Sequence, residues 1–211
     1  MPGAGAAGTA AEKKSLHGSE RHTPRVRGMR GAYARELKRT RAGKRVYVDE
    51  TGATTGMTRL RGRAPPGERV VEAVPQGCWQ MTTLVGALRR DGPTAALALD
   101  GATDALAFES FVRQTLCPTL RKGDRVVMDR LGAHRDPVIE RLIETAGARL
   151  LYLPPYSPDL NPIEEMWSKV KQHLRSAAPR TQEQLIDAMG DALRDVTAHD
   201  ARGYFGHLGC R

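Results

Sequence analysis

The chain has 211 residues, of which 40% are hydrophobic and 27% charged, a composition that excludes a wholly disordered protein and suits one domain with a tail. Its formal net charge is +9, and residues 1–45, with twelve Lys or Arg and three Glu, hold all of that excess. Such a basic arm is either a segment that contacts nucleic-acid phosphates or a solvated tail, and composition favours neither interpretation.

Cysteine usage and hydropathy bear on where the protein works. Cys78, Cys117 and Cys210 are widely spaced and include no C-x-x-C pair, which argues against a zinc ribbon and against a disulfide framework. The N-terminus lacks the pattern of a secretory signal, and the least polar run, residues 77–88, is too short and too polar to cross a bilayer. We therefore expect a soluble protein of the cytoplasm with no membrane partner.

The first half of the chain predicts a basic arm followed by strands. Residues 1–28 have no apolar periodicity and are expected to be mostly disordered, and residues 29–42 contain good helix formers that predict one basic helix. A short apolar strand at residues 45–49 ends in Asp49 and precedes a turn at residues 52–56. Further strands are expected at residues 57–63, 68–74, 79–88 and 94–99, with turns at Pro65-Pro66-Gly67 and Asp91-Gly92-Pro93.

The second half predicts alternating helices and strands. Apolar residues at helical spacing predict helices at residues 104–116, 137–146, 162–176 and 182–196. Asp136 is the expected N-cap of the second of these, and Thr181 with Gln184 the capping box of the last. Strand-like segments lie at residues 125–129 and 149–153. Early antiparallel strands followed by helix-linked strands predict an α/β fold, a mixed sheet with helices on both faces.

Three carboxylates stand where a metal site could form. Asp49 and Asp129 each end an apolar strand, and if the two strands are neighbours, about 4.8 Å apart, both acids can reach one cation. Glu164 lies in the first turn of the helix after the loop PPYSPDLNP, on the margin of its apolar stripe. Hard oxygen donors without Cys or His suit Mg²⁺ or Mn²⁺, and two such ions can serve phosphodiester chemistry.

Each of these side chains also has a purely structural interpretation. Asp49 and Asp129 could be turn residues at strand ends, and Glu164 could be the partner of Asn161 in a helix capping box. His134 could orient a ligand or a phosphate, or play a structural role only. A solvent-facing or loop-fixing role is expected for the neighbouring acids Glu50, Asp159 and Glu165.

Three segments of the chain resemble the catalytic domain of insertion-sequence-630/mariner transposases: VDETGATTGMTRLRGRAPPGERV, VVMDRLGAH and LLYLPPYSPDLNPIEEMWSKVK. The likeness covers residues 44–208 in one collinear order. The 34 residues between Asp129 and Glu164 match the spacing of the family's Asp-Asp-Glu branch.

The resemblance implies an RNase H-like fold, with a five-stranded mixed sheet flanked by helices, for residues 44–208, and leaves residues 1–43 as the basic arm. It implies that Asp49, Asp129 and Glu164 are catalytic and bind two Mg²⁺ or Mn²⁺ ions. The implied activity is cleavage of DNA at transposon ends and transfer of the 3′-hydroxyl to target DNA. The implied setting is a homodimer on DNA, in a bacterial cytoplasm at the nucleoid.

The chain departs from the family pattern at two places. Arg130 follows the second acid where the family usually has Asn, and it could either compete with a metal for the carboxylates or contact a DNA phosphate. The first interpretation, which we favour from the sequence alone, predicts impaired catalysis and allows an alternative function as a non-specific DNA-binding or regulatory protein. Residues 1–43 also resemble no helix-turn-helix domain, so we expect terminal repeats to be read by a separate or fused helix-turn-helix product.

Overall fold

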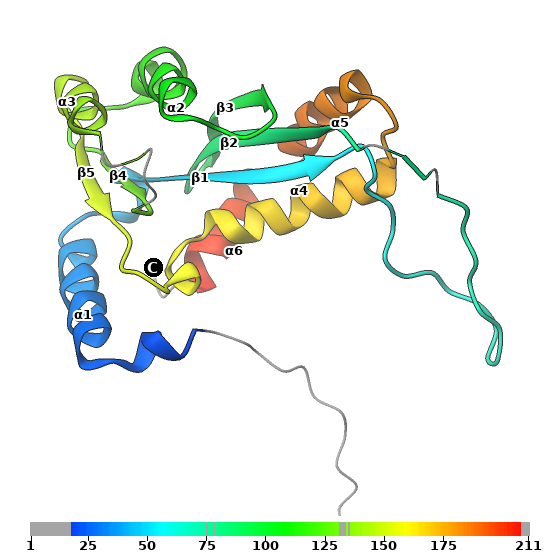
Figure 1. Cartoon of the computed structure of the whole chain (residues 1–211). Helices are drawn as coiled ribbons and strands as arrows, with labels where there is room; N and C mark the ends of the chain where they lie inside the picture. The colour runs from blue at the N-terminus through cyan, green and yellow to red at the C-terminus, as the bar shows by residue number, and fades with distance from the viewer. Residues whose placement is uncertain (1–17, 75, 78, 131–133, 135, 208–211) are drawn as a thin grey trace, which may run out of the picture.

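The computed structural model describes residues 18–74, 76–77, 79–130, 134 and 136–207. A five-stranded sheet of order β3-β2-β1-β4-β5 forms its centre (Figure 1). The strands are β1 (Arg45–Thr54), β2 (Met81–Arg89), β3 (Gly92–Asp100), β4 (Arg125–Met128) and β5 (Arg149–Tyr152). Strand β2 is antiparallel to both of its neighbours, β1 and β3, whereas β1, β4 and β5 run parallel to one another. The predicted mixed sheet is therefore confirmed.

Helices cover both faces of the sheet, as Figure 1 shows. They are α1 (Pro24–Lys38), α2 (Ala105–Phe111), α3 (Pro137–Thr145), α4 (Ile163–Ala177), α5 (Gln182–Arg194) and α6 (Ala198–His207). One core lies between the sheet and α2 and α3, and the other lies between the sheet and α4, α5, α6 and part of α1. No helix in the described ranges is long and apolar enough to span a membrane.

Strand alternation decides which face of the sheet carries the two aspartates. Val46 and Val48 pack into the core under α2 and α3, whereas Tyr47 packs into the core under α4. Because successive side chains of a strand point to opposite faces, Asp49 lies on the α4 face. The same alternation in β4, where Val127 pairs with Tyr47, brings Asp129 to that face as well. The acids and helix α4 therefore meet on one side of the sheet.

A glycine in β2 seats α4 against the sheet. Gly86 pairs with Asp49 across the β1–β2 ladder, and a Cβ atom at Gly86 would lie 2.6 Å from Cη2 of Trp167. Trp167 is 2% exposed, so its ring occupies the space that a side chain at position 86 would need. The close approach fixes the depth at which α4, and with it Glu164, lies over the sheet.

Gly86→Ala is expected to destabilise the protein by about 1–3 kcal/mol, because the added methyl group overpacks a filled core at Trp167. Urea unfolding followed by circular dichroism measures the loss. Gly52→Ala is the matched control in the adjoining strand, since a Cβ atom there meets only the Met81 sulfur at 4.0 Å. Equal stability of the two variants would show that α4 can shift freely over the sheet.

A buried ion pair joins the two strands that flank β1. Arg89, at the end of β2, donates through Nη2 to Asp124 Oδ2 at 2.6 Å and to the Thr119 carbonyl oxygen at 2.9 Å. Asp124, which directly precedes β4, also accepts from the backbone N–H of Arg121 and lies 3.7 Å from Lys44 Nζ. Both side chains of the Arg89–Asp124 pair are almost fully buried.

The expected strands at residues 57–63 and 68–74 are wrong. This segment projects from the domain as a long loop between β1 and β2 (Figure 1), and its two arms make no strand ladder in the described residues. The Pro65-Pro66-Gly67 turn does form, with the Glu68 N–H donating to the Pro65 carbonyl. Side chains on both sides of the loop are exposed, Leu60 and Val71 among them, so β-propensity has no core to bury against.

Several element boundaries also differ from the prediction. β1 runs through residue 54, into the expected turn at 52–56, because antiparallel pairing with β2 extends it, and the turn itself lies at residues 55–56. The β2–β3 turn lies at residues 90–91, one residue earlier than expected. The basic helix spans residues 24–38 and not 29–42, because Thr23 caps it and Pro24 takes its first position. Helix α6 was not predicted.

Helix α1 is packed onto the domain that follows it. Tyr33 and Leu37 lie in the core shared with α4, and Arg45 donates to the carbonyl oxygens of Leu37 and Thr40 at the end of the helix. The expectation that residues 1–28 are mostly disordered is wrong for residues 18–28, which hold a helical turn at Ser19–His22 and the start of α1, and residues 1–17 lie outside the described residues.

Candidate active site

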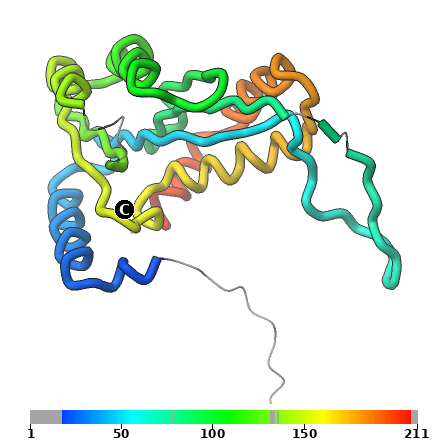
Figure 2. Tube along the Cα trace, in the orientation of Figure 1, coloured from blue at the N-terminus to red at the C-terminus, as the bar shows by residue number. Residues whose placement is uncertain are grey.

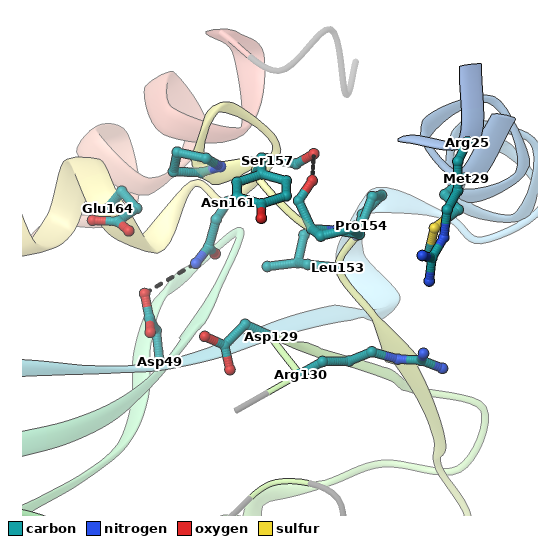
Figure 3. Close-up of a pocket in the computed structure, with 13 residues that line it drawn as sticks. Arg25, Met29, Asp49, Asp129, Arg130, Leu153, Pro154, Ser157, Asn161 and Glu164 are labelled. Carbon is teal, nitrogen blue, oxygen red and sulfur yellow. Dashed lines mark hydrogen bonds between the residues drawn. The ribbon is translucent and has the colours of Figure 1, made fainter. Parts of the chain in front are cut away.

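The three predicted acids line one cleft of about 450 Å³ (Figure 3). Asp49 comes from the middle of β1, Asp129 directly follows β4, and Glu164 lies in the first turn of α4. The remaining lining residues come from α1, from the position after Asp129 and from the segment after β5: Arg25, Met29, Arg130, Leu153, Pro154, Pro155, Tyr156, Ser157, Pro158 and Asn161. The cleft thus has an acidic side and a side that is basic and apolar.

Asp49 accepts two hydrogen bonds, and its environment disfavours the ionised form of its carboxyl group. Its Oδ1 accepts from the backbone N–H of Glu50 at 2.8 Å, and its Oδ2 accepts from Asn161 Nδ2 at 3.0 Å. Burial raises the pKa of Asp49 to about 7, with the charges of Glu164 and Asp129 adding to the rise against the opposing Glu50 hydrogen bond and His134 charge. At neutral pH this carboxyl group would gain from a nearby cation.

The buried ring of His134 contacts the carboxylate of Asp129. Its Nδ1 lies 2.6 Å from Asp129 Oδ1, its Nε2 lies 3.5 Å from Glu50 Oε1, and its ring stacks on Phe108 with centroids 4.1 Å apart. Burial lowers the pKa of His134, but the hydrogen bonds and charges of Asp129 and Glu50 outweigh that effect and raise it to about 9. A ring with this pKa is protonated at neutral pH, so its Nδ1–H donates to Asp129 and its positive charge faces Glu50. Glu50, expected to face solvent, is partly buried here.

Glu164 does not take part in the capping box considered from the sequence. No side chain caps the start of α4, and Asn161 points its amide at Asp49 instead (Figure 3). Burial raises the pKa of Glu164, and the charge of Asp129 adds to this while Lys171 opposes it. Glu164 and Asp129 are thus close enough to influence each other's charge, which leaves Glu164 available to the cleft.

Arg130 is directed along the cleft wall and not toward the acids. Figure 3 shows its side chain extending away from the Asp129 carboxylate, toward the side where Arg25 and Met29 of α1 lie. Its Cζ lies 5.0 Å from the centroid of the Tyr152 ring, a cation–π distance. Of the two interpretations of Arg130 left by the sequence, the geometry favours the outward one.

The donor set suits a hard divalent cation. All three acids offer oxygen, their carboxyl groups repel one another, and Asn161 Oδ1 is buried without a hydrogen-bond partner among the described residues. Among the residues that the structure describes, no three His, Cys, Asp or Glu side chains lie close enough together to form a preformed metal site. The residues fit Mg²⁺ or Mn²⁺ by chemistry, and they line a common cleft.

Sequence reasoning missed the contribution of α1 to the cleft. Arg25 and Met29, one helical turn apart, line it together with Tyr156, whose backbone is left-handed with φ of 54°. The Thr23-Pro24 pair carried a signal for an earlier helix start, which would have placed Arg25 and Met29 on one face. Nothing local indicated that this face would lie beside the acids.

Comparison with known proteins identifies relatives of the chain. The family model described as DDE superfamily endonuclease matches residues 44–186. The Transposable element Tcb2 transposase of Caenorhabditis briggsae is 29% identical over 124 residues, which are 57% of this chain and 42% of that protein. The chain therefore spans less than half the length of this curated relative.

Solved structures of Mos1 transposase share the fold. The Mos1 strand transfer complex matches with a TM-score of 0.74 and 16% identity over 97% of this chain and 63% of that chain. The Mos1 mariner paired end complex with Mn gives 0.71 and 16% over 97% and 64%, and the Mos1 mariner catalytic domain gives 0.62 and 14% over 94% and 92%. These likenesses confirm the predicted RNase H-like fold.

Proposed function

The chain belongs to the DDE superfamily endonucleases, and we propose that it is the catalytic domain of a transposase that cuts DNA at transposon ends and joins the freed 3′-hydroxyl to target DNA. The observation that carries the proposal is the convergence of Asp49, Asp129 and Glu164 on one cleft. They come from β1, from the end of β4 and from the first turn of α4.

In this proposal Asp49, Asp129 and Glu164 hold two Mg²⁺ or Mn²⁺ ions. The bound ions would supply positive charge that activates the attacking hydroxyl and stabilises the leaving oxygen. Asn161 keeps Asp49 in one rotamer, and His134 does the same for Asp129. In cleavage, water attacks phosphorus and the P–O3′ bond breaks. In transfer, the 3′-hydroxyl attacks a phosphorus of the target, and the new P–O bond forms as the target's own P–O3′ bond breaks and leaves a target 3′-hydroxyl.

Arg25 and Arg130 give the DNA backbone a place beside the acids. Both side chains line the cleft on the side away from Glu164 (Figure 3). Guanidinium groups bind phosphate oxygens bidentately, and phosphate contacts position a duplex without reading its sequence. We assign these two arginines to the phosphates that flank the scissile one.

Arg130→Asn is expected to weaken DNA binding and to make the salt dependence of the affinity shallower by about one, since one phosphate contact is lost. The Mg²⁺ concentration for half-maximal nicking should not change. Binding isotherms at several salt concentrations measure the slope. Arg202→Asn, an exposed arginine of α6 outside the cleft lining, is the control. Tighter metal binding with faster nicking in Arg130→Asn would instead show that Arg130 impairs the metal site.

The alternative function, a catalytically impaired DNA-binding or regulatory protein, is less well supported. All three acids line the cleft, and Arg130 is directed away from Asp129. Action on paired transposon ends would involve two copies of the chain on DNA, with end recognition supplied by a separate or fused helix-turn-helix product.

Strand cleavage tests the proposed function directly. The substrate is a duplex with the element's own terminal repeats, incubated with the full chain and Mg²⁺ or Mn²⁺. Metal-dependent nicking at the repeat end is the expected result. DNA binding without nicking at any metal concentration would contradict the proposal and support the regulatory alternative.

A further inference from the structure

The segment between β5 and α4 governs two parts of the cleft. It carries Asn161, which holds Asp49, and it leads directly into Glu164. Its turn at Pro158–Leu160 is closed by backbone hydrogen bonds from Leu160 N–H to Ser157 and from Asn161 N–H to Pro158. A shift of this turn would therefore move the partner of one acid and the start of the helix that carries another.

Helix α1 holds this turn from outside. Arg30 Nη2 donates to Asp159 Oδ2 at 2.7 Å, while its Nη1 donates to Asp159 Oδ1 at 3.1 Å and to Ser157 Oγ at 2.6 Å. Arg21 Nη2 donates to the same Asp159 Oδ2 at 2.8 Å. Figures 1 and 2 show α1 lying alongside the segment that follows β5. Burial raises the pKa of Asp159, but Arg30 and Arg21 outweigh that effect and leave it below its usual value.

The guanidinium group of Arg30 binds other residues of the chain, although Arg30 belongs to the basic arm that could contact DNA. The Arg30 side chain is 20% exposed. Both of its terminal nitrogens donate hydrogen bonds, as a bidentate pair to the Asp159 carboxylate and from Nη1 also to the Ser157 hydroxyl. The helix beneath it is fixed by Tyr33 and Leu37 in the core. By contrast, Arg27 of the same helix is exposed, and its side chain makes no hydrogen bond or ion pair with the described residues. Arg30 therefore extends from a helix that is packed into the core and binds two defined partners, Asp159 and Ser157.

We propose that Arg30, aided by Arg21, is a positioning residue of the active site: it clasps Asp159 and Ser157 and so fixes the turn that places Asn161 against Asp49 and Glu164 at the cleft. Its effect on the turn is a property of the fold. Its effect on catalysis rests on the proposed function, because a small displacement of a catalytic constellation lowers the rate of the chemical step.

Hydrogen exchange tests the clasp without any assay of activity. In the full chain, Arg30→Met should raise amide exchange at Leu160 and Asn161 about tenfold, whereas Arg27→Met, which removes the same charge from the same helix, should not. Asp159→Asn should reproduce the effect of Arg30→Met, and the double variant should add little to either, because residues that act as one unit are not additive. Unchanged exchange in Arg30→Met, or full additivity, would overturn the clasp.

Nicking kinetics test the catalytic consequence. At saturating DNA, Arg30→Met should nick about tenfold more slowly and need more Mg²⁺ for half-maximal rate, while its DNA affinity falls only as far as that of Arg27→Met. A rate unchanged at saturating DNA, with affinity lost beyond the control, would overturn the proposal and make Arg30 a phosphate contact. If the parent chain does not nick at all, the proposed function fails, and the exchange result still decides the clasp.

Discussion

Asp129→Asn is expected to slow metal-dependent nicking about a thousandfold while leaving the fold intact. A carboxylate that binds metal helps to provide several kcal/mol of transition-state stabilisation, and about 4 kcal/mol corresponds to a factor of about a thousand in rate. Asparagine fills the same space but brings no charge. Single-turnover nicking at saturating DNA measures the rate, and Glu140→Gln, an exposed acid of α3, is the control.

The same variant separates a lost metal site from a damaged fold. With Mg²⁺ at about a hundred times its dissociation constant, the parent should gain about 2.7 kcal/mol of stability, because the ion binds only the folded state. Asp129→Asn should lose most of that gain and keep its stability in EDTA. An equal gain in parent and variant would show that the stabilising ion binds away from Asp129.

Arg89→Met is expected to destabilise the protein by about 3–5 kcal/mol, the largest stability effect that we foresee. The substitution leaves the fully buried Asp124 with its backbone donor at Arg121 and with Lys44, whose Nζ is 3.7 Å away. Removing one partner of a buried ion pair is costly because the remaining charge stays out of water. The midpoint of urea unfolding, with the slope checked for constancy, measures the loss.

A second substitution should restore much of that stability. Arg89 Nε and Nη1 and Asp124 Oδ1 are buried without hydrogen-bond partners in the described structure, so the pair is incompletely satisfied. Replacing both members by apolar residues, as in Arg89→Met with Asp124→Leu, removes these unmet groups together. A loss below about 1 kcal/mol in the single variant would indicate that Lys44 moves in to neutralise Asp124.

Local patterns predicted the elements that carry the acids. The charge-free runs before Asp49 and Asp129 are central strands of the sheet, and their alternation places both acids on one face. Asp136 caps α3 through the Val138 N–H, as expected from the Asp-Pro pair. These features depend on residues a few positions apart, which is the range over which periodicity and capping act.

Local patterns gave the wrong prediction for two kinds of segment. One has no surface to pack against, and the other packs against a surface that is distant in the sequence. The arms of the β1–β2 loop have strand-like composition, yet they project from the domain and pair with no strand among the residues that the structure describes. Helix α1 reads as a basic helix of an exposed arm, yet Tyr33 and Leu37 make it part of the core. Propensity describes what a segment can form, whereas burial decides what it does form.

The amino-acid sequence by itself determined the apolar strand segments that lead into Asp49 and Asp129, the glutamate at the start of α4 and the concentration of positive charge near the N-terminus. Only the tertiary structure decided how the polar side chains around them are used. Asn161 binds Asp49 across 112 positions of sequence, and Arg30 binds Ser157 across 127. A polar side chain has many candidate partners, and the one it takes depends on which segments the packed core brings within about 3 Å of it.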